Sequence, residues 1–212
     1  KKCLYLLLFV AVFCQAARFS KTKTDGFAMA KIVSTLAYDP QWDVPCNNLG
    51  GVKKILNQPF TYLSKGVQTY VFASEMENSP QAFKARPYAT GPLDPLAPEA
   101  VSKTPNRKKQ SKLNKDFTSY KIAYEELKDE TGLVFLHLNK TDDLKQRLTL
   151  TDKIGISHTL DLDQFEFFVQ KRASLIYPTL SNLIERGEIE EGKKALSSLV
   201  SLLEARFEKQ IF

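Results

Sequence analysis

The chain has 212 residues, a formal net charge of +6, and 43% hydrophobic and 25% charged residues. These proportions are those of one good-sized globular domain or two small ones, and they exclude collagen-like, low-complexity and wholly disordered chains. The excess of 30 Lys and Arg over 24 Asp and Glu is too small to indicate a nucleic-acid partner by itself.

The first 17 residues have the layout of a secretory signal peptide. Two lysines precede an uncharged apolar run from Cys3 to Cys14, and the small residues Ala16 and Ala17 follow it. Spanning a bilayer takes about 20 apolar residues, so the run is short for a membrane anchor, which is the alternative. We therefore expect 1–17 to be a cleaved signal peptide. The mature chain is expected to be exported, secreted or periplasmic, with no transmembrane segment.

The mature chain has few residues of the types that act as nucleophiles, bases or metal ligands. Cleavage would leave Cys46 as its single cysteine, so an internal disulfide is excluded. His137 and His158 with one cysteine fall short of a closed zinc set, and we expect His137, which lies in an apolar run, to be a core residue. Neither a nucleophile elbow nor a zinc-protease motif is present. We therefore predict no metal site and no catalytic residue.

An irregular N-terminal extension is predicted over 18–58, because prolines, asparagines and glycines interrupt it. One short helix is expected within it, around Phe27 to Leu36. Aromatic and β-branched residues then indicate strands, and Ser64-Lys65-Gly66 is expected to be a hairpin turn between the first two. The three strands are predicted at 60–62, 67–72 and 81–88.

A proline-rich and basic insertion is predicted over 87–115. Five prolines lie between 87 and 105, and residues 103–115 carry six basic and no acidic side chains. Such a basic cluster can bind phosphates or an anionic surface. The alternative, which we favour, is a solvated loop that leads into a helix.

A helix is predicted over 112–130, because Leu113, Phe117, Tyr120 and Tyr124 recur at helical spacing. Strands with apolar or alternating patterns follow, and 152–155 is expected to be the turn of a hairpin. Two C-terminal helices end the chain, and we expect the apolar stripe of the second to pack against the rest of the protein. The predicted strands lie at 133–138, 148–151, 156–162 and 165–169, and the helices begin at Tyr177 and Glu188.

The order of these elements predicts an α+β fold, an antiparallel sheet with one packed helix followed by two C-terminal helices. This order resembles the small lobe of a protein-kinase-like fold over 59–172, with the start of the large lobe over 173–212. In kinases a glycine loop covers the ATP phosphates, and a lysine on the third strand pairs with a glutamate on the next helix. The resemblance implies that Gly66 lies in that loop, that Lys84 is the lysine, and that Glu125 or Glu126 is its partner.

The same resemblance implies that ATP is bound weakly and that 165–172 meets the adenine. A kinase-like fold places its catalytic aspartate and metal-binding asparagine after the helix expected at 188–212, so we expect this chain to bind nucleotide without transferring phosphate. The phrases YKIAYEELKDETGLVFLHLNKT and FEFFVQKRASLIYP are also similar to a family of exported proteins from Chlamydia-related bacteria, which brings no established activity. The alternative function is a non-enzymatic secreted interaction protein that uses 103–115 to bind an anionic surface or a protein partner.

Overall fold

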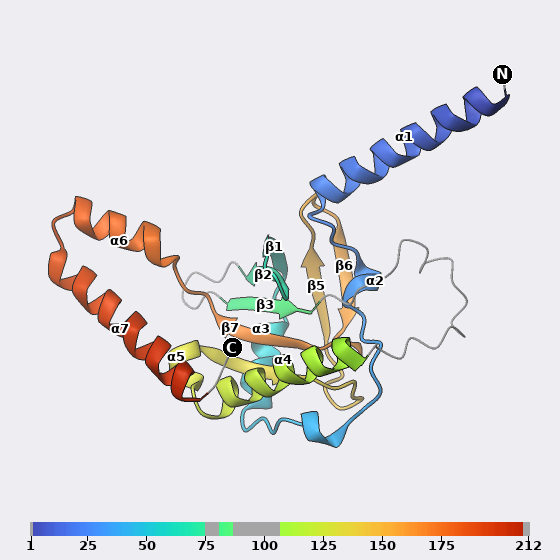
Figure 1. Ribbon diagram of the computed structural model, residues 1–212. Coiled ribbons are helices and arrows are strands. Elements are labelled where there is room, and N and C mark those ends of the chain that lie inside the picture. The colour runs from blue at the N-terminus through green and yellow to red at the C-terminus, as the bar shows by residue number, and fades with distance from the viewer. Residues whose placement is uncertain (1, 75–80, 87–106, 210–212) are drawn as a thin grey trace.

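The computed structural model describes residues 2–74, 81–86 and 107–209 (Figure 1). The chain is 49% helical and 22% strand, which confirms the α+β fold with its two C-terminal helices. The helices are α1 (Lys2–Lys23), α2 (Met29–Ile32), α3 (Leu49–Leu56), α4 (Arg107–Glu125), α5 (Lys128–Thr131), α6 (Ile176–Glu185) and α7 (Ile189–Glu208), with short 3-10 helices η1 (Pro40–Trp42) and η3 (Leu162–Gln164). The strands are β1 (Phe60–Lys65), β2 (Tyr70–Ser74), β3 (Gln81–Ala85), β4 (Leu133–His137), β5 (Arg147–Thr151), β6 (Ser157–Asp161) and β7 (Phe167–Lys171).

All seven strands belong to one sheet, in the order β4-β7-β3-β2-β1-β5-β6 (Figure 1). Neighbouring strands are antiparallel except β1 and β5, which are parallel, with Phe60 opposite Leu150. The prediction of a purely antiparallel sheet is therefore wrong. The chain passes through β2, β3, α4, α5 and β4 between these two strands, so no tight turn dictates an antiparallel direction.

The N-terminal segment covers one face of the sheet. Phe60, Phe72, Phe83 and Phe167 point to this face, and each is fully buried. The predicted short helix is α2, whereas α3 was not predicted from the sequence. Asn48 caps α3, because its side chain accepts a hydrogen bond from the N–H of Gly51 at 3.0 Å. The segment predicted as an irregular extension thus supplies core side chains, namely Phe27, Ile32, Val52 and Leu56.

Helix α4 packs on the opposite face. Leu113, Phe117 and Tyr124 of the predicted apolar stripe are buried there, and Phe117 meets Trp42 edge-on with ring centroids 5.2 Å apart. The helix begins at Arg107, earlier than predicted, because the basic residues before 112 are good helix formers. The rest of the predicted proline-rich insertion, 87–106, lies outside the described residues.

The predicted hairpin of β5 and β6 is confirmed, and Asp152 forms its turn. One carboxylate oxygen accepts hydrogen bonds from the N–H groups of Ile154 and Ile156, at 3.1 and 2.9 Å. The other lies 2.9 Å from Nε2 of His158, which is half-buried. Gly155 adopts φ +87°, a conformation that favours glycine at the tip of this turn.

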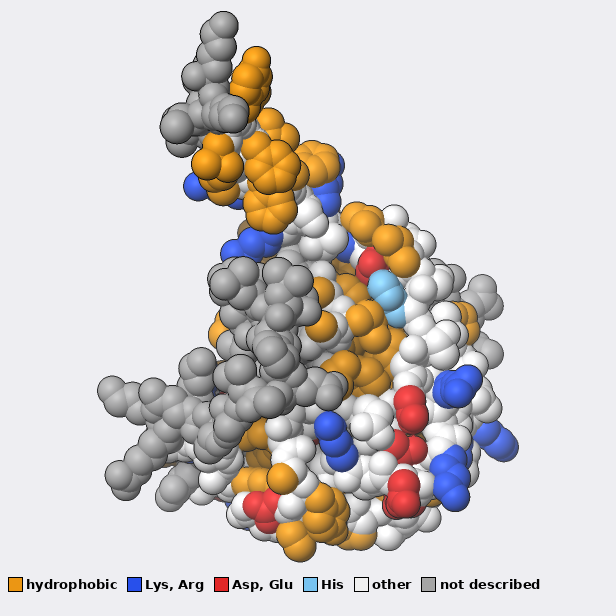
Figure 2. Space-filling view, turned by 90° about the vertical axis from the view of Figure 1, so that its right-hand side faces the viewer, with side chains coloured by type: hydrophobic (Ala, Val, Ile, Leu, Met, Phe, Trp, Pro, Cys, Tyr) orange, Lys and Arg blue, Asp and Glu red, His pale blue; other side chains and the backbone are white. Residues whose placement is uncertain are grey.

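Helix α1 contains the predicted signal peptide and projects away from the sheet (Figures 1 and 2). Within the described residues, no helix is both long enough and apolar enough to cross a membrane. Large apolar side chains are exposed along α1, namely Tyr5, Leu6, Leu8, Phe9, Val10, Val12, Phe13 and Phe19.

The C-terminal helices α6 and α7 pack on each other as a helical hairpin. The apolar stripe of α7 was expected to pack against the protein, and this prediction is wrong for four of its residues. Leu196, Val200, Leu203 and Phe207 are exposed, with Phe207 83% accessible. Contact between α7 and the sheet domain includes an ion pair between Lys209, directly after the helix, and Glu126.

The loop between β4 and β5 is organised by Asp163 of η3. Its buried carboxylate accepts hydrogen bonds from the Thr141 hydroxyl and from the N–H groups of Leu144 and Lys145, at 3.1 and 2.7 Å for the two N–H groups. Burial raises the pKa of Asp163, but these hydrogen bonds together outweigh it, and the pKa lies below its ordinary value of 3.8.

Because the pKa of Asp163 is lower in the folded than in the unfolded state, its ionised form stabilises the fold. This stabilisation is complete above about pH 4 and is lost as the pH falls through the folded-state pKa. We expect Asp163→Asn to lower the free energy of unfolding at neutral pH and to flatten its decline in acid, as measured by urea denaturation. Asp142→Asn, at an exposed neighbour, should leave the profile unchanged.

In Asp163→Asn the slope of the free energy of unfolding against pH should be reduced rather than abolished, because the pKa values of Asp25 and Asp152 are lowered too. An acid profile that is as steep in Asp163→Asn as in the unsubstituted chain would contradict this assignment.

Candidate functional site

Lys84 lies in the middle of β3, half-buried, on the face of the sheet that α4 covers. Its Nζ donates a hydrogen bond to Oε1 of Gln170 at 2.5 Å and lies 5.5 Å from the centre of the Phe168 ring. Burial lowers the pKa of Lys84, since the charged ammonium loses solvation there. Gln170 in turn donates to the backbone carbonyl of Thr131, which connects Lys84 to the end of α5.

Lys84 occupies the centre of a row of cross-strand neighbours. Strand pairing places Leu136, Phe168, Lys84, Val71 and Ser64 next to one another across five strands. The row runs from Leu136, which is 2% accessible, through half-buried side chains to the exposed Ser64. Lys84 therefore stands between a covered and an open part of the same face.

Gly66 lies in the turn between β1 and β2, as predicted, whereas Ser64 and Lys65, which were predicted to share the turn, belong to β1. Its N–H donates to the carbonyl of Thr69 at 2.8 Å and so closes the turn. Its φ is outside the left-handed region, and a Cβ at this position would be 3.5 Å from the Thr69 carbonyl oxygen, an ordinary contact. The turn does not need glycine for its conformation.

Glu125 and Glu126 are exposed at the C-terminal end of α4. Glu126 forms its ion pair with Lys209. Among the ion pairs of the described residues, none joins Lys84 to either glutamate. The structure thus brings Lys84 into the candidate site and leaves the two predicted partners outside it.

A different ion pair joins β3 to α4. Nη1 of Arg86, directly after β3, lies 2.8 Å from Oδ2 of Asp116, and both side chains are mostly buried, at 16% and 10% accessible. Oδ1 of Asp116 accepts a hydrogen bond from Gln68 in the β1–β2 turn at 3.1 Å, and Gln68 accepts one from the Tyr120 hydroxyl at 3.1 Å. The hairpin turn, the third strand and the helix therefore meet in one polar network.

Sequence reasoning missed Asp116, although a signal was present. Asp116 precedes Phe117 and lies four residues before Tyr120, so it borders the apolar stripe that the periodicity identified. An acidic residue at that position faces the sheet rather than water, and such a residue needs a cationic partner. The positions of Glu125 and Glu126 gave no such signal, because they lie on the polar side of the helix.

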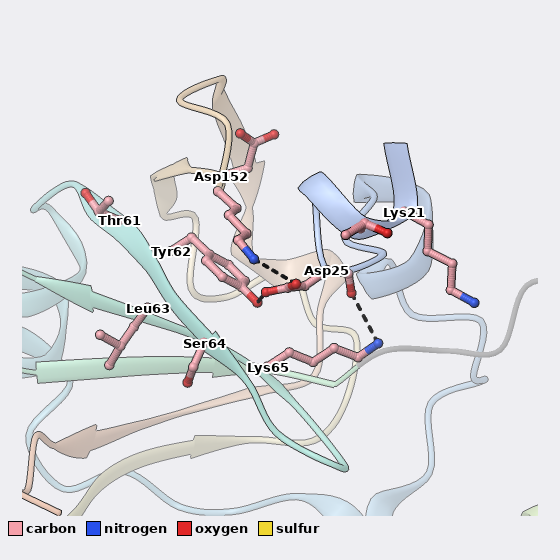
Figure 3. Close-up of a pocket in the computed structure, with 10 residues that line it drawn as sticks. Lys21, Asp25, Thr61, Tyr62, Leu63, Ser64, Lys65 and Asp152 are labelled. Atoms are coloured by element: carbon pink, nitrogen blue, oxygen red, sulfur yellow. Dashed lines mark hydrogen bonds and ion pairs between the residues drawn. The ribbon is translucent and has the colours of Figure 1, made fainter. Parts of the chain in front are cut away.

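A second group of charged side chains surrounds the end of α1 (Figure 3). A cavity of about 890 Å³ lies there, bordered by Lys21, Tyr62, Lys65 and Lys153 among others. Asp25 is at its centre, with its carboxylate 2.8 Å from Nζ of Lys153 and 2.7 Å from the Tyr62 hydroxyl. These lysines were not singled out from the sequence, because three separate segments supply this charge cluster.

Comparison with family models, curated proteins and solved structures finds no match to this chain. Groups of three or more His, Cys, Asp or Glu side chains placed to hold a metal ion do not occur among the described residues. His137 is buried, with Nδ1 2.8 Å from the Phe165 carbonyl oxygen and Nε2 3.0 Å from the Thr141 hydroxyl, which confirms its place in the core.

Removing one partner of the pair between β3 and α4 leaves a buried charge without its counterion. We expect Asp116→Ala to lower the free energy of unfolding by about 1–3 kcal/mol, because Arg86 and Gln68 both lose their acceptor. Urea denaturation followed by circular dichroism measures this. Asp142→Ala, at an exposed aspartate, is the matched control and should stay within about 0.5 kcal/mol of the unsubstituted chain.

The double variant Arg86→Met with Asp116→Leu should cost less than the sum of the two single changes, because the apolar pair leaves no charge unpaired. If Asp116→Ala and the control Asp142→Ala lower the free energy of unfolding equally, the ion pair of Arg86 and Asp116 does not stabilise the contact between β3 and α4.

Proposed function

We propose that the sheet domain binds the phosphate groups of a nucleotide on the face that carries Lys84, in the manner of a kinase-like small lobe. The observation that carries this proposal is the position of Lys84. It lies on the third strand of an antiparallel five-strand unit, β1-β2-β3-β7-β4, whose same face is packed by the next helix, α4. The chain order β1, β2, β3, α4 and β4 supports the proposal, because it follows the order that the resemblance implies.

The surroundings of Lys84 also favour an anionic ligand. A half-buried ammonium whose hydrogen-bond partner is a neutral amide keeps an uncompensated positive charge. A phosphate group would restore that compensation. The turn that contains Gly66 joins β1 to β2, the strand beside β3, and Gly66 itself is exposed.

The pair formed by Arg86 and Asp116 takes the place of the predicted lysine–glutamate pair. It links the third strand to the helix, and through Gln68 it also holds the hairpin turn. Lys84 is then not neutralised by an acidic partner on α4. In this proposal Lys84 acts as a phosphate ligand, and the adjacent ion pair positions the strand, turn and helix around it.

We also propose that the protein is exported by means of 1–17 and is secreted or periplasmic. The arrangement of the core supports this, because its earliest member in the chain is Phe27. Cleavage after Ala16 or Ala17 therefore removes exposed apolar side chains and leaves the core intact. The alternative is an interaction protein that binds a partner through 103–115. The described part of that segment is the start of α4, and it gives no separate support for this alternative.

Intact-mass measurement of the protein recovered from a secreting host tests export. The expected product begins near Arg18, because small residues precede that position. A recovered chain that retains the residues before Ala16 would contradict cleavage there.

Nucleotide binding is tested by thermal unfolding of the full chain in ATP and in ADP. At about ten times the dissociation constant, binding raises the free energy of unfolding by about 1.4 kcal/mol, which corresponds to an increase in Tm of roughly 3–6 °C. Lys84→Met should abolish this increase, because the phosphates lose their cation. Lys115→Met, which removes an exposed charge on α4, is the matched control and should retain it.

The absence of any nucleotide-dependent increase in the unsubstituted chain would overturn the proposal. An increase that persists in Lys84→Met would place the nucleotide elsewhere on the protein.

A further inference from the structure

Two residues that line the cavity at the end of α1, Tyr62 and Lys65, lie on the opposite face of the sheet from Lys84. Tyr62, which lines the cavity, and Tyr70 belong to the same core face as Phe72. The Tyr70 hydroxyl donates to the carbonyl of Gly26 at 2.7 Å. The ammonium groups at this end of the sheet therefore lie apart from Lys84, although Ser64, at the exposed end of the row of Lys84, also lines the cavity.

Two ammonium groups approach the same glycine. Nζ of Lys31 and Nζ of Lys65 lie 3.7 and 3.9 Å from the point that a Cβ of Gly26 would occupy. Lys31 donates to the Gly26 carbonyl at 2.6 Å, and Lys65 donates to the Asp25 carbonyl at 3.2 Å. Each ammonium has three donors, so both retain hydrogen atoms that these carbonyls do not use. The side chain of Lys21 packs against the same point, through Cγ at 3.7 Å.

The acidic groups nearby are already engaged. The Asp25 carboxylate binds Lys153 and the Tyr62 hydroxyl, and Asp152 binds His158 and the backbone of its own turn. Lys31 and Lys65 thus have backbone carbonyls as partners, without a carboxylate of their own among the interactions of the described residues. Partial burial lowers the pKa of Lys31, and the charges of Lys65 and Lys21 lower it further.

We propose that Lys31 and Lys65, with Lys21 beside them, bind a phosphate group at the edge of this cavity, which Lys21 and Lys65 line and which Lys31 adjoins at Gly26. The oxygen atoms of a doubly charged phosphate group accept several charge-assisted hydrogen bonds at once. Two neighbouring ammonium groups can donate such bonds. The cavity of about 890 Å³ leaves the group open to solvent (Figure 3). Such a phosphate can belong to a soluble phosphate compound or to the headgroup of an anionic lipid.

The position of α1 makes the lipid source chemically reasonable. The part of α1 that remains after cleavage of 1–17 carries the exposed Phe19 and, at the base of the helix, the basic residues Lys21 and Lys23 (Figure 2). Each lysine near an anionic membrane surface adds about 1 kcal/mol of attraction. The competing role for the lysines is structural, because lysines that donate to carbonyls beyond a helix end stabilise that end. The experiment must therefore separate phosphate binding from helix capping.

The first experiment labels the lysines of the full chain with an amine-reactive ester, with and without pyrophosphate, and measures each site by mass spectrometry. Lys31 and Lys65 should lose reactivity by about tenfold when pyrophosphate is bound, which corresponds to about 1.4 kcal/mol of protection. Exposed lysines elsewhere, Lys54 and Lys115, should not change. Equal protection of all four lysines, or none, overturns the proposal.

The second experiment titrates pyrophosphate into variants by calorimetry. Lys31→Met with Lys65→Met should weaken binding about tenfold or more. Lys54→Met with Lys115→Met removes the same net charge and should bind like the unsubstituted chain. A purely structural role would lower stability in the first variant without changing its affinity, and that result overturns the proposal. If the first variant does not fold, Lys31→Arg with Lys65→Arg replaces it; this variant keeps both charges and should bind pyrophosphate. The labelling experiment on the unsubstituted chain does not depend on any variant and still tests the proposal.

Vesicles identify the source of the phosphate. If the protein sediments with phosphatidylcholine vesicles that contain phosphatidylglycerol, and the variant Lys31→Met with Lys65→Met does not, the phosphate belongs to a lipid headgroup. Pyrophosphate protection without phosphatidylglycerol-dependent sedimentation supports a soluble phosphate compound. The labelling reads Lys31 and Lys65 directly, whereas the nucleotide site is tested by thermal unfolding in ATP and ADP, so failure of this site and failure of the nucleotide site are distinguished.

Discussion

The ring of Phe83 contacts the rings of Phe60, Phe72 and Phe167, with centroids 5.9, 6.4 and 5.0 Å apart. These four side chains come from four neighbouring strands, and together they join the centre of the sheet into one aromatic core. The N-terminal segment packs onto the same rings through Phe27. Because side chains alternate along a strand, the burial of Phe83 fixes Lys84 on the other face. The position of the candidate nucleotide ligand is therefore a consequence of the core.

The hairpin of β1 and β2 connects the two proposed sites. Lys65, at the end of β1, bonds to the Asp25 carbonyl on one face, whereas Gln68 in the following turn bonds to Asp116 of α4 on the other. The turn is held from both sides by polar contacts that tolerate movement better than close apolar packing does. A ligand on either face therefore acts on the same short segment of chain.

Local sequence patterns predicted the parts of the fold that depend on local interactions. The hairpin around Asp152, the stripe of α4 and the third strand with Lys84 follow from alternation, helical spacing and turn residues. The place of β5 beside β1 could not be predicted this way, because no periodicity says which distant strand supplies a neighbour. Asp116 was missed for a related reason, since its partner Arg86 is distant in sequence. The exposure of Phe207 was also missed, because spacing shows that a helix has an apolar face and not what covers it.

The parallel pairing of β1 with β5 has a consequence for how the chain is made. Phe60 and Leu150 are about 90 residues apart, so β1 has an open edge until β5 is synthesised, which at ordinary translation rates takes roughly 5–20 seconds. Open strand edges recruit strands from other chains. Pro59 directly before β1 and Lys65 at its end are the kinds of residue that discourage such pairing. The same lysine that borders the cavity thus also protects the newly made strand against aggregation.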